Sequence, residues 1–209
     1  MSAPKPTLLT PREYLEIERK AEVRSEYIGG RLYAMPGSNR LHNLIAGNIL
    51  AALKTQLRGK QCETYAADMR VKIAPTGTYT YPDVITVCGE PRFEDPFVDT
   101  LLNPTLIVEV LSTSTEAYDR GEKFAQYRSL DSLREYMLVA QNKSRVEHYR
   151  REASAGCCRR STFPASGCTS RRSDARSPWP ISMRGSISKL MANGLKPLPP
   201  TPQPSPEAC

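Results

Sequence analysis

A glutamate stands in the middle of a strongly apolar segment, and this arrangement limits what the chain can fold into. The segment Leu106–Leu111 consists of Leu, Ile and Val except for Glu109. A run that is apolar on both faces is typical of a central strand that is covered on each side. A lone buried carboxylate costs on the order of several kcal/mol, or takes up a proton. We therefore expect Glu109 to lie in a central strand beside a partner that compensates its charge.

Two more charged residues stand in similar surroundings. Asp83 opens the apolar run Val84–Cys88, and Lys123 follows Glu109 on an expected helix. Two carboxylates about 4 Å apart repel each other by about 4 kcal/mol at an effective dielectric of 20, so a cation must intervene unless one of them is protonated. Oxygen ligands suit Mg²⁺ or Mn²⁺ better than zinc. The residues predict a metal-dependent phosphodiesterase, and so a nuclease, in which Lys123 orients water and offsets transition-state charge.

The two acidic residues also have purely structural interpretations. Asp83 follows Pro82 and can cap a turn at the entry to its strand. Glu109 can form a structural salt bridge, for which Arg70 and Lys72 are candidate partners.

Structural interpretations exist for the remaining candidates as well. Lys123 can make a surface pair with Asp119 four residues earlier on a helix. Glu26 can supply a third carboxylate to the site or can be a solvated residue at a helix end. His42 lies beside the apolar stripe of an expected helix, where a partly buried structural histidine is more common than a phosphate contact.

The folded part of the chain is predicted to be α/β. Thr10, Pro11 and Glu13 form a helix-start pattern, for a helix that runs to about Val23. Gly29-Gly30 predicts a two-residue hairpin, and Ser38 is expected to cap a second helix. The other expected elements are strands 63–67, 69–74, 84–88, 105–111 and 136–140, an edge strand 145–149, and a helix from 115 or 119 to 128.

The positive charge of the chain is concentrated after Arg151. The net charge is +7, but residues 1–151 hold 21 Lys/Arg and 19 Asp/Glu, whereas residues 152–209 hold 8 and 3. We therefore give the net charge little weight as a sign of DNA binding, although a near-neutral nuclease can still carry a basic groove locally.

The amino-acid composition of the chain changes abruptly at residue 152. Residues 152–209 hold four of the six Cys and nine of the 18 Pro, and patterned strands and helices vanish. We expect residues 1–151 to form an endonuclease-like domain and residues 152–209 to be a disordered, low-complexity tail rich in Pro, Ser, Arg and Cys. The same composition also fits translation in a shifted reading frame.

Location and thiol state follow from two absences. No apolar run is long enough to cross a bilayer, and residues 1–10 lack the apolar core of a secretory signal. We therefore expect a cytoplasmic protein without a membrane partner, in which Cys62 and Cys88 are buried free thiols and not a disulfide.

The sequence lacks the motifs of other common classes of catalytic and binding site. The sequence has no Gly-rich phosphate loop followed by Lys-Ser/Thr, no Gly-x-Ser-x-Gly elbow and no Cys-x-x-Cys pair. Its two histidines, His42 and His148, are too few for an ordinary zinc site.

The order of motifs resembles the Uma-two family, restriction-endonuclease-like proteins of the PD-(D/E)xK nuclease superfamily. The similarity spans roughly residues 7–151 and rests on these segments: Glu26–Leu32, Tyr81–Val84, Val108–Thr115, Asp119–Lys123 and Tyr127. The resemblance implies a mixed β-sheet flanked by helices, a DNA substrate and a divalent cation, Mg²⁺ or Mn²⁺.

The resemblance also implies roles for individual residues. Asp83 and Glu109 would be metal ligands, with the backbone carbonyl of Val110 available as a third. The lysine that usually stands two residues after the second acid is absent, since Leu111 occupies that place. Its counterpart on the following helix would be Lys123.

Glu26 matches a helix-end glutamate that such proteins place near the site. After Arg151 the chain departs from the family, which continues with further strands and helices. The sequence therefore predicts a DNA endonuclease-like protein, with a non-catalytic, truncated interaction protein of the same fold as the alternative. A homodimer would supply the two sites that double-strand cutting needs, and a nuclease acting on RNA or branched DNA would use the same residues.

Overall fold

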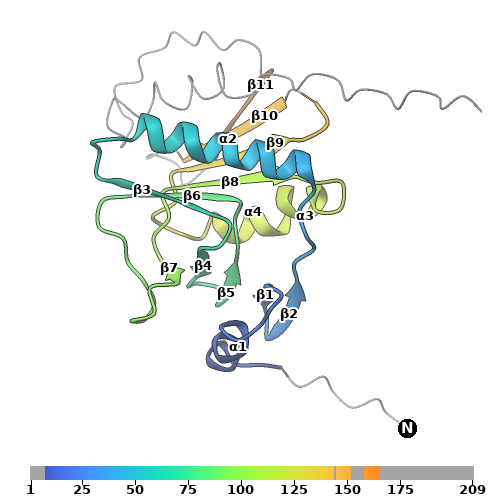
Figure 1. Ribbon diagram of the computed structural model, residues 1–209, viewed down its shortest axis with the longest axis vertical. Helices are drawn as coiled ribbons and strands as arrows, with labels where there is room; N and C mark the ends of the chain where they lie inside the picture. The colour runs from blue at the N-terminus through green and yellow to red at the C-terminus, as the bar shows by residue number, and fades with distance from the viewer. Residues whose placement is uncertain (1–7, 144, 152–157, 165–209) are drawn as a thin grey trace, which may run out of the picture.

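Two mixed β-sheets and four helices make up the part of the chain that the computed structural model describes, which is residues 8–143, 145–151 and the backbone of 158–164 (Figure 1). The helices are α1 Pro11–Glu18, α2 Arg40–Gln56, α3 Glu116–Arg120 and α4 Glu122–Tyr127. None of the described helices is long and apolar enough to cross a membrane. The predicted fold class, a mixed α/β structure in which helices flank a sheet, is confirmed.

The smaller sheet has five strands in the order β2-β1-β5-β4-β7. Its strands are β1 Ser25–Ile28, β2 Arg31–Ala34, β4 Arg70–Ile73, β5 Thr78–Thr80 and β7 Thr100–Leu101. The larger sheet has six strands in the order β11-β10-β9-β8-β6-β3. Its strands are β3 Cys62–Ala66, β6 Val84–Cys88, β8 Leu106–Leu111, β9 Glu135–Ala140, β10 Arg145–Arg151 and β11 Cys158–Pro164.

Helix α1 begins where the sequence predicts and ends earlier. Thr10 and Glu13 form a complete capping box, and Pro11 is the first helical residue. The helix stops at Glu18 instead of about Val23, because the Glu18 Oε1 accepts a hydrogen bond from the Ser25 N–H at 2.9 Å and so helps to hold the chain in a reversal.

The hairpin between β1 and β2 has the turn that its sequence demands. Gly29 and Gly30 have φ values of 56° and 85°, a region that glycine enters without steric cost. Two consecutive positive φ values match the right-handed twist of the strands they join. The register that follows places Glu26 opposite Tyr33.

Helix α2 covers one face of the six-stranded sheet, and α4 lies on the other (Figure 1). The N-cap of α2 is Asn39, and not Ser38 as expected. The Asn39 Oδ1 accepts a hydrogen bond of 2.9 Å from the His42 N–H. Ile49, Leu53 and Leu57 point into the core at the predicted helical spacing.

Strand β8 lies inside the larger sheet and is buried along its whole length, as predicted. Leu106, Val108 and Val110 pack on the side of α2, whereas Ile107 and Leu111 pack on the side of α4. This alternation is the normal period of a strand, so Glu109 faces α4.

The predicted third helix is divided at Gly121, whose φ and ψ of −105° and −96° are not helical. A Cβ at this position would lie 3.1 Å from the Ala117 carbonyl oxygen, so the close approach favours glycine. The break redirects α4, which packs Phe124 and Tyr127 against the sheet.

Three features of the sheets differ from the sequence-based expectations. The short strands β5 and β7 were not predicted, because two or three residues carry no periodic pattern. Strand β10 is not an edge strand, since it pairs with β9 on one side and with β11 on the other. Strand β11 lies in the segment that the sequence predicts to be a tail, so the sheet extends beyond Arg151; the rest of that segment lies outside the described residues.

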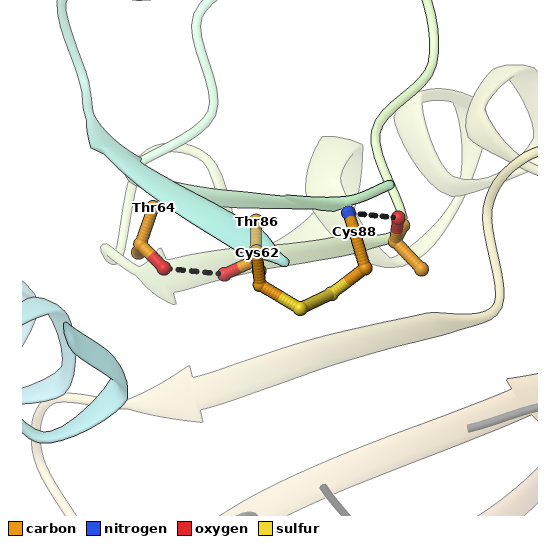
Figure 2. The surroundings of a disulfide bond; sticks show 5 residues. Cys62, Thr64, Thr86 and Cys88 are labelled. Carbon is orange, nitrogen blue, oxygen red and sulfur yellow. Dashed lines mark hydrogen bonds between the residues drawn. A yellow bond between two sulfur atoms is a disulfide. The ribbon is translucent and has the colours of Figure 1, made fainter. Parts of the chain in front are cut away.

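The prediction that Cys62 and Cys88 are free thiols is wrong, because the two residues form a disulfide in this structure (Figure 2). The antiparallel register of β3 and β6 places the two cysteines directly opposite each other, with Cα atoms 4.1 Å apart. Next to them, the hydroxyls of Thr64 and Thr86 share a hydrogen bond of 3.1 Å (Figure 2). The disulfide ties the edge strand β3 to its neighbour β6. Sequence spacing alone does not reveal the cross-strand register that brings the two thiols together.

Reduction of this disulfide is expected to lower the free energy of unfolding by about 3 kcal/mol, because it releases a closed loop in the unfolded chain. Urea unfolding followed by circular dichroism, with and without reductant, measures the difference. The Cys62→Ser/Cys88→Ser variant keeps the other four cysteines and should not respond to reductant. A wild-type curve that reductant leaves unchanged would contradict the prediction.

Candidate functional site

The two predicted acidic residues lie at opposite positions of neighbouring strands. Strands β6 and β8 are antiparallel, with Val84 paired to Val108, so the same register places Asp83 opposite Glu109. The Asp83 Oδ2 accepts a hydrogen bond of 2.7 Å from the Val110 N–H, which attaches the start of β6 to β8.

Lys123 lies at the centre of the site. Its Nζ is 3.0 Å from Oε1 of both Glu26 and Glu109, and 3.7 Å from Oδ1 of Asp119. All four side chains are buried. Glu26 comes from β1 of the smaller sheet and Glu109 from β8 of the larger one, so a single ammonium joins the two sheets at this point.

Charge in this cluster is unbalanced, because three carboxylates surround one ammonium. Burial raises the pKa of Glu109 well above its usual range, and the carboxylates of Asp119, Asp83 and Glu26 raise it further, while Lys123 opposes them. Burial also raises the pKa of Asp119. Although burial disfavours the ammonium of Lys123, the three carboxylates outweigh burial and raise its pKa well above the ordinary value.

Hydroxyl groups complete the surroundings of Glu109. The Tyr127 hydroxyl lies 3.0 Å from both Glu109 Oε1 and Thr80 Oγ1. Burial raises the pKa of Tyr127 well above its usual range, so the phenol stays protonated and can donate to the carboxylate. On the other side of the site, the Tyr118 ring centroid lies 6.0 Å from Lys123 Nζ.

His42 approaches the site from the first turn of α2. Its Nε2 lies 3.2 Å from Asp83 Oδ2. The hydrogen bond with Asp83 raises the pKa of His42 against the opposing effect of burial, and the Asp83 charge and the Val110 carbonyl add to the rise. The partly buried histidine that we expected here therefore contacts a predicted site residue.

The structure brings together Glu26, Asp83, Glu109 and Lys123, the four side chains predicted for the site. Glu109 does not pair with either of the structural partners considered from the sequence. Arg70 binds Asp99 at 2.8 Å, and Lys72 pairs with Glu94.

Asp119 is the residue that sequence reasoning underrated, since it was considered only as a surface partner of Lys123. It is buried, and the Tyr136 hydroxyl donates to its backbone carbonyl at 3.0 Å. A signal was present: Asp119, Lys123 and Tyr127 follow one another at four-residue spacing, which places them on one side of the α3–α4 region.

Metal ligands are not already assembled around a common point. Within the described part of the chain, no group of three or more His, Cys, Asp or Glu side chains is arranged to hold a metal ion. The contacts explain this: Glu26 and Glu109 turn toward Lys123, while Asp83 turns toward His42 and the Val110 N–H.

Comparison with known proteins agrees with the motif order. A family model described as "Uma2: Putative restriction endonuclease" matches residues 11–173. The chain belongs to the Uma2 family. Two relatives from Synechocystis sp. carry the names uncharacterized protein sll1609 and uncharacterized protein slr1290. The first is 40% identical over 144 residues, covering 69% of this chain and 81% of the relative. The second is 38% identical over 148 residues, covering 71% and 76%.

A crystal structure described as a putative nuclease belonging to DUF820, from Anabaena variabilis, has the same fold as this Uma2 protein. The TM-score is 0.63 at 17% identity, over 85% of this chain and 92% of that chain. The resemblance noted from the sequence is therefore confirmed at the level of family and fold.

Replacing Lys123 by Met should destabilise the Uma2 protein by about 3 kcal/mol or more, because Glu26, Glu109 and Asp119 would lose the buried cation that they share. The loss should be smaller at pH 5 than at pH 8. A carboxylate whose pKa is raised by folding binds its proton more tightly in the folded protein than in the unfolded chain. Protonation therefore stabilises the folded protein at low pH, and this contribution disappears as pH rises through the pKa of the folded state. Urea unfolding at the two pH values measures both effects.

The exposed Lys20 provides the control, since Lys20→Met should change stability by less than about 0.5 kcal/mol. Equal effects of the two substitutions at pH 8 would show that the Lys123 ammonium does not hold the site together.

Proposed function

We propose that this Uma2 protein is a metal-dependent endonuclease that hydrolyses phosphodiester bonds in DNA. The observation that carries the proposal is the pairing of Asp83 with Glu109 across β6 and β8, next to the buried ammonium of Lys123. Membership of a family described as putative restriction endonucleases and the fold of a described nuclease support the same reaction class.

The residues of the site fit a divalent cation. Three carboxylates, those of Glu26, Glu109 and Asp119, surround a single buried ammonium. Repulsion from the charges of Asp119, Asp83 and Glu26 contributes to the raised pKa of Glu109. An additional cation would relieve this repulsion. The donors are oxygen atoms, which favours Mg²⁺ or Mn²⁺ over zinc.

Asp83, Glu109 and the Val110 backbone carbonyl are the groups that would hold the cation in this proposal. When bound, such an ion supplies a Lewis acid for a phosphate oxygen and lowers the pKa of a water molecule. Holding it through Glu109 requires the carboxylate to be shared with, or released from, Lys123.

Lys123 is proposed to orient the attacking water and to stabilise the negative charge that develops on the phosphate. Its raised pKa keeps the ammonium charged throughout the neutral range. Glu26 then acts as a positioning residue that holds the Lys123 ammonium from the side of β1, and its oxygen also accepts from the Tyr81 N–H at 3.3 Å. Tyr127 fixes the orientation of Glu109 through its hydroxyl.

Nicking of supercoiled plasmid tests the reaction. The wild-type protein should nick DNA with Mg²⁺ or Mn²⁺ and not with EDTA, and Asp83→Asn or Lys123→Ala should slow nicking by about 100-fold or more, since each removes a group that acts on the reacting phosphate. Lys123→Arg keeps the buried charge and separates the catalytic role from folding, and Lys20→Ala is the surface control. Residual activity of Lys123→Ala equal to that of the wild type would remove the lysine from the mechanism.

Binding of the ion can be measured without catalysis. Mg²⁺ at about ten times its dissociation constant should raise the melting temperature by about 3 °C or more. Asp83→Asn should abolish this shift, because it replaces a charged ligand by a neutral amide. A Mg²⁺ shift that survives Asp83→Asn would place the ion elsewhere. Absence of both the shift and the nicking would favour the non-catalytic interaction protein.

A further inference from the structure

One segment of the chain contains basic residues and no acidic ones, a feature that the net charge does not reveal. From residue 27 to residue 62 the sequence contains five Lys/Arg and no Asp or Glu. The remaining residues of 1–151 contain 16 Lys/Arg and 19 Asp/Glu, a net charge of −3. The cations of this acid-free segment, residues 27–62, are all exposed: Arg31, Arg40, Lys54, Arg58 and Lys60.

The first part of this segment lies between two residues of the candidate site, Glu26 and His42. Glu26, the residue immediately before it, binds Lys123 from strand β1. The chain then forms β2, all four residues of which are exposed, and continues to α2 (Figure 1). In the first turn of α2, His42 contacts Asp83. The chain between Glu26 and His42 therefore leaves the site, includes the solvent-facing strand β2 and returns to the site at the start of α2.

The N-terminus of α2 carries positive charge where helix energetics favour negative charge. Its first turn contains Arg40 and His42 and no acidic residue. A helix N-terminus carries a partial positive charge, so a cation there costs a few tenths of a kcal/mol or more. Stability of the helix therefore does not account for Arg40.

The outward face of α2 is smooth as well as basic. Helical spacing puts five exposed residues of α2 on one stripe, opposite Ile49 and Leu53, which face the sheet: Arg40, Leu44, Gly47, Ala51 and Lys54. The exposed Arg58 follows just after the end of the helix, and we count it with this stripe. A Cβ on Gly47 would meet nothing within 4 Å. The fold thus does not need a glycine at this place, although Gly within a helix costs about 1 kcal/mol relative to Ala.

We propose that the α2 stripe, together with Arg31 on β2, binds the phosphate backbone of duplex DNA and leads it to the site at the N-terminal end of α2. This inference rests on the proposed function and names the surface that holds its substrate. From Arg40 to Lys54 the helix rises about 21 Å, which corresponds to about six base-pair steps. Small residues between the cations let a rigid polyanion approach the helix closely.

Charge complementarity selects DNA over the other occupants. A second copy of the chain would bring the same cations against this surface, and like charges repel. The C-terminal segment of the chain, residues 152–209, has a net charge of +5 and is disfavoured for the same reason. A polyanion gains from each cation through release of its counterions.

The test is a fluorescence anisotropy titration of a labelled 30-base-pair duplex with the full chain in EDTA, at several salt concentrations. Arg40→Gln/Lys54→Gln/Arg58→Gln removes three charges from the stripe. Lys20→Gln/Arg92→Gln/Lys143→Gln removes three exposed charges elsewhere and is the matched control. We expect the stripe variant to raise the dissociation constant about tenfold or more at 0.1 M salt and to reduce the slope of log K against log salt by about 2 to 3. The control should leave both nearly unchanged.

Equal weakening by the two triple variants would overturn the proposal, because binding would then depend on net charge alone. Unchanged DNA binding by the stripe variant would overturn the proposal too. So would a stripe variant that binds DNA normally but changes the oligomeric state of the protein in sedimentation, because the surface would then bind a second copy of the chain. Asp83→Asn separates this inference from the proposed reaction, since it should abolish nicking and leave DNA affinity unchanged or slightly higher. Loss of affinity in the stripe variant without any nicking by the wild type would keep the surface and reject the nuclease. Circular dichroism melting of both triple variants checks that they fold equally well.

Discussion

The buried ammonium of Lys123 is the interaction on which the rest of the site depends. It lies 3.0 Å from a carboxylate of each sheet, Glu26 on β1 and Glu109 on β8. Neither carboxylate could remain ionised in the interior without a compensating charge. The lysine therefore determines how the hairpin of the smaller sheet sits against the larger sheet, and the break at Gly121 sets the direction of the helix that carries it.

The fold makes room for this polar cluster without interrupting its apolar core. Along β8 the residues alternate between a core on the α2 side and a core on the α4 side. Glu109 replaces one apolar residue of the second set, and Lys123 and Tyr127 of α4 supply its partners. A structural ion pair needs balanced charges, whereas carboxylates outnumber ammonium groups in this cluster. In the proposed function, an additional cation would offset this excess of negative charge.

Electrostatic charge is separated across the molecule. Carboxylates gather in the interior of the site, and the exposed cations of residues 27–62 carry no acidic neighbours in the sequence. His42 joins the two regions, because it stands at the start of α2 and contacts Asp83. An anionic polymer that follows the outer surface of α2 would thus meet the acidic site only at the end of the helix. Within residues 1–151, the five cations of residues 27–62 are largely offset by the net charge of −3 on the other residues, so the small net charge of this part conceals the basic surface.

The sequence by itself determined most of the longer elements and the candidate residues of the site. Thr10 and Glu13 start a helix, Gly29-Gly30 makes a hairpin, and the apolar run around Glu109 forms a central strand, because each depends on local geometry or on the period of a strand. Asp83, Glu109 and Lys123 could be selected because charges in apolar surroundings need partners. Glu26, for which the residues alone left two interpretations open, was added through the family resemblance.

Only the tertiary structure decided which partners these charges have. The register of β6 and β8 sets Asp83 opposite Glu109, the meeting of two sheets brings Glu26 to Lys123, and the register of β3 and β6 pairs Cys62 with Cys88. Burial of Asp119 and the approach of His42 are likewise long-range consequences. Local patterns say how a segment prefers to fold, but distances between segments far apart in the chain are set by how the sheets and helices pack together.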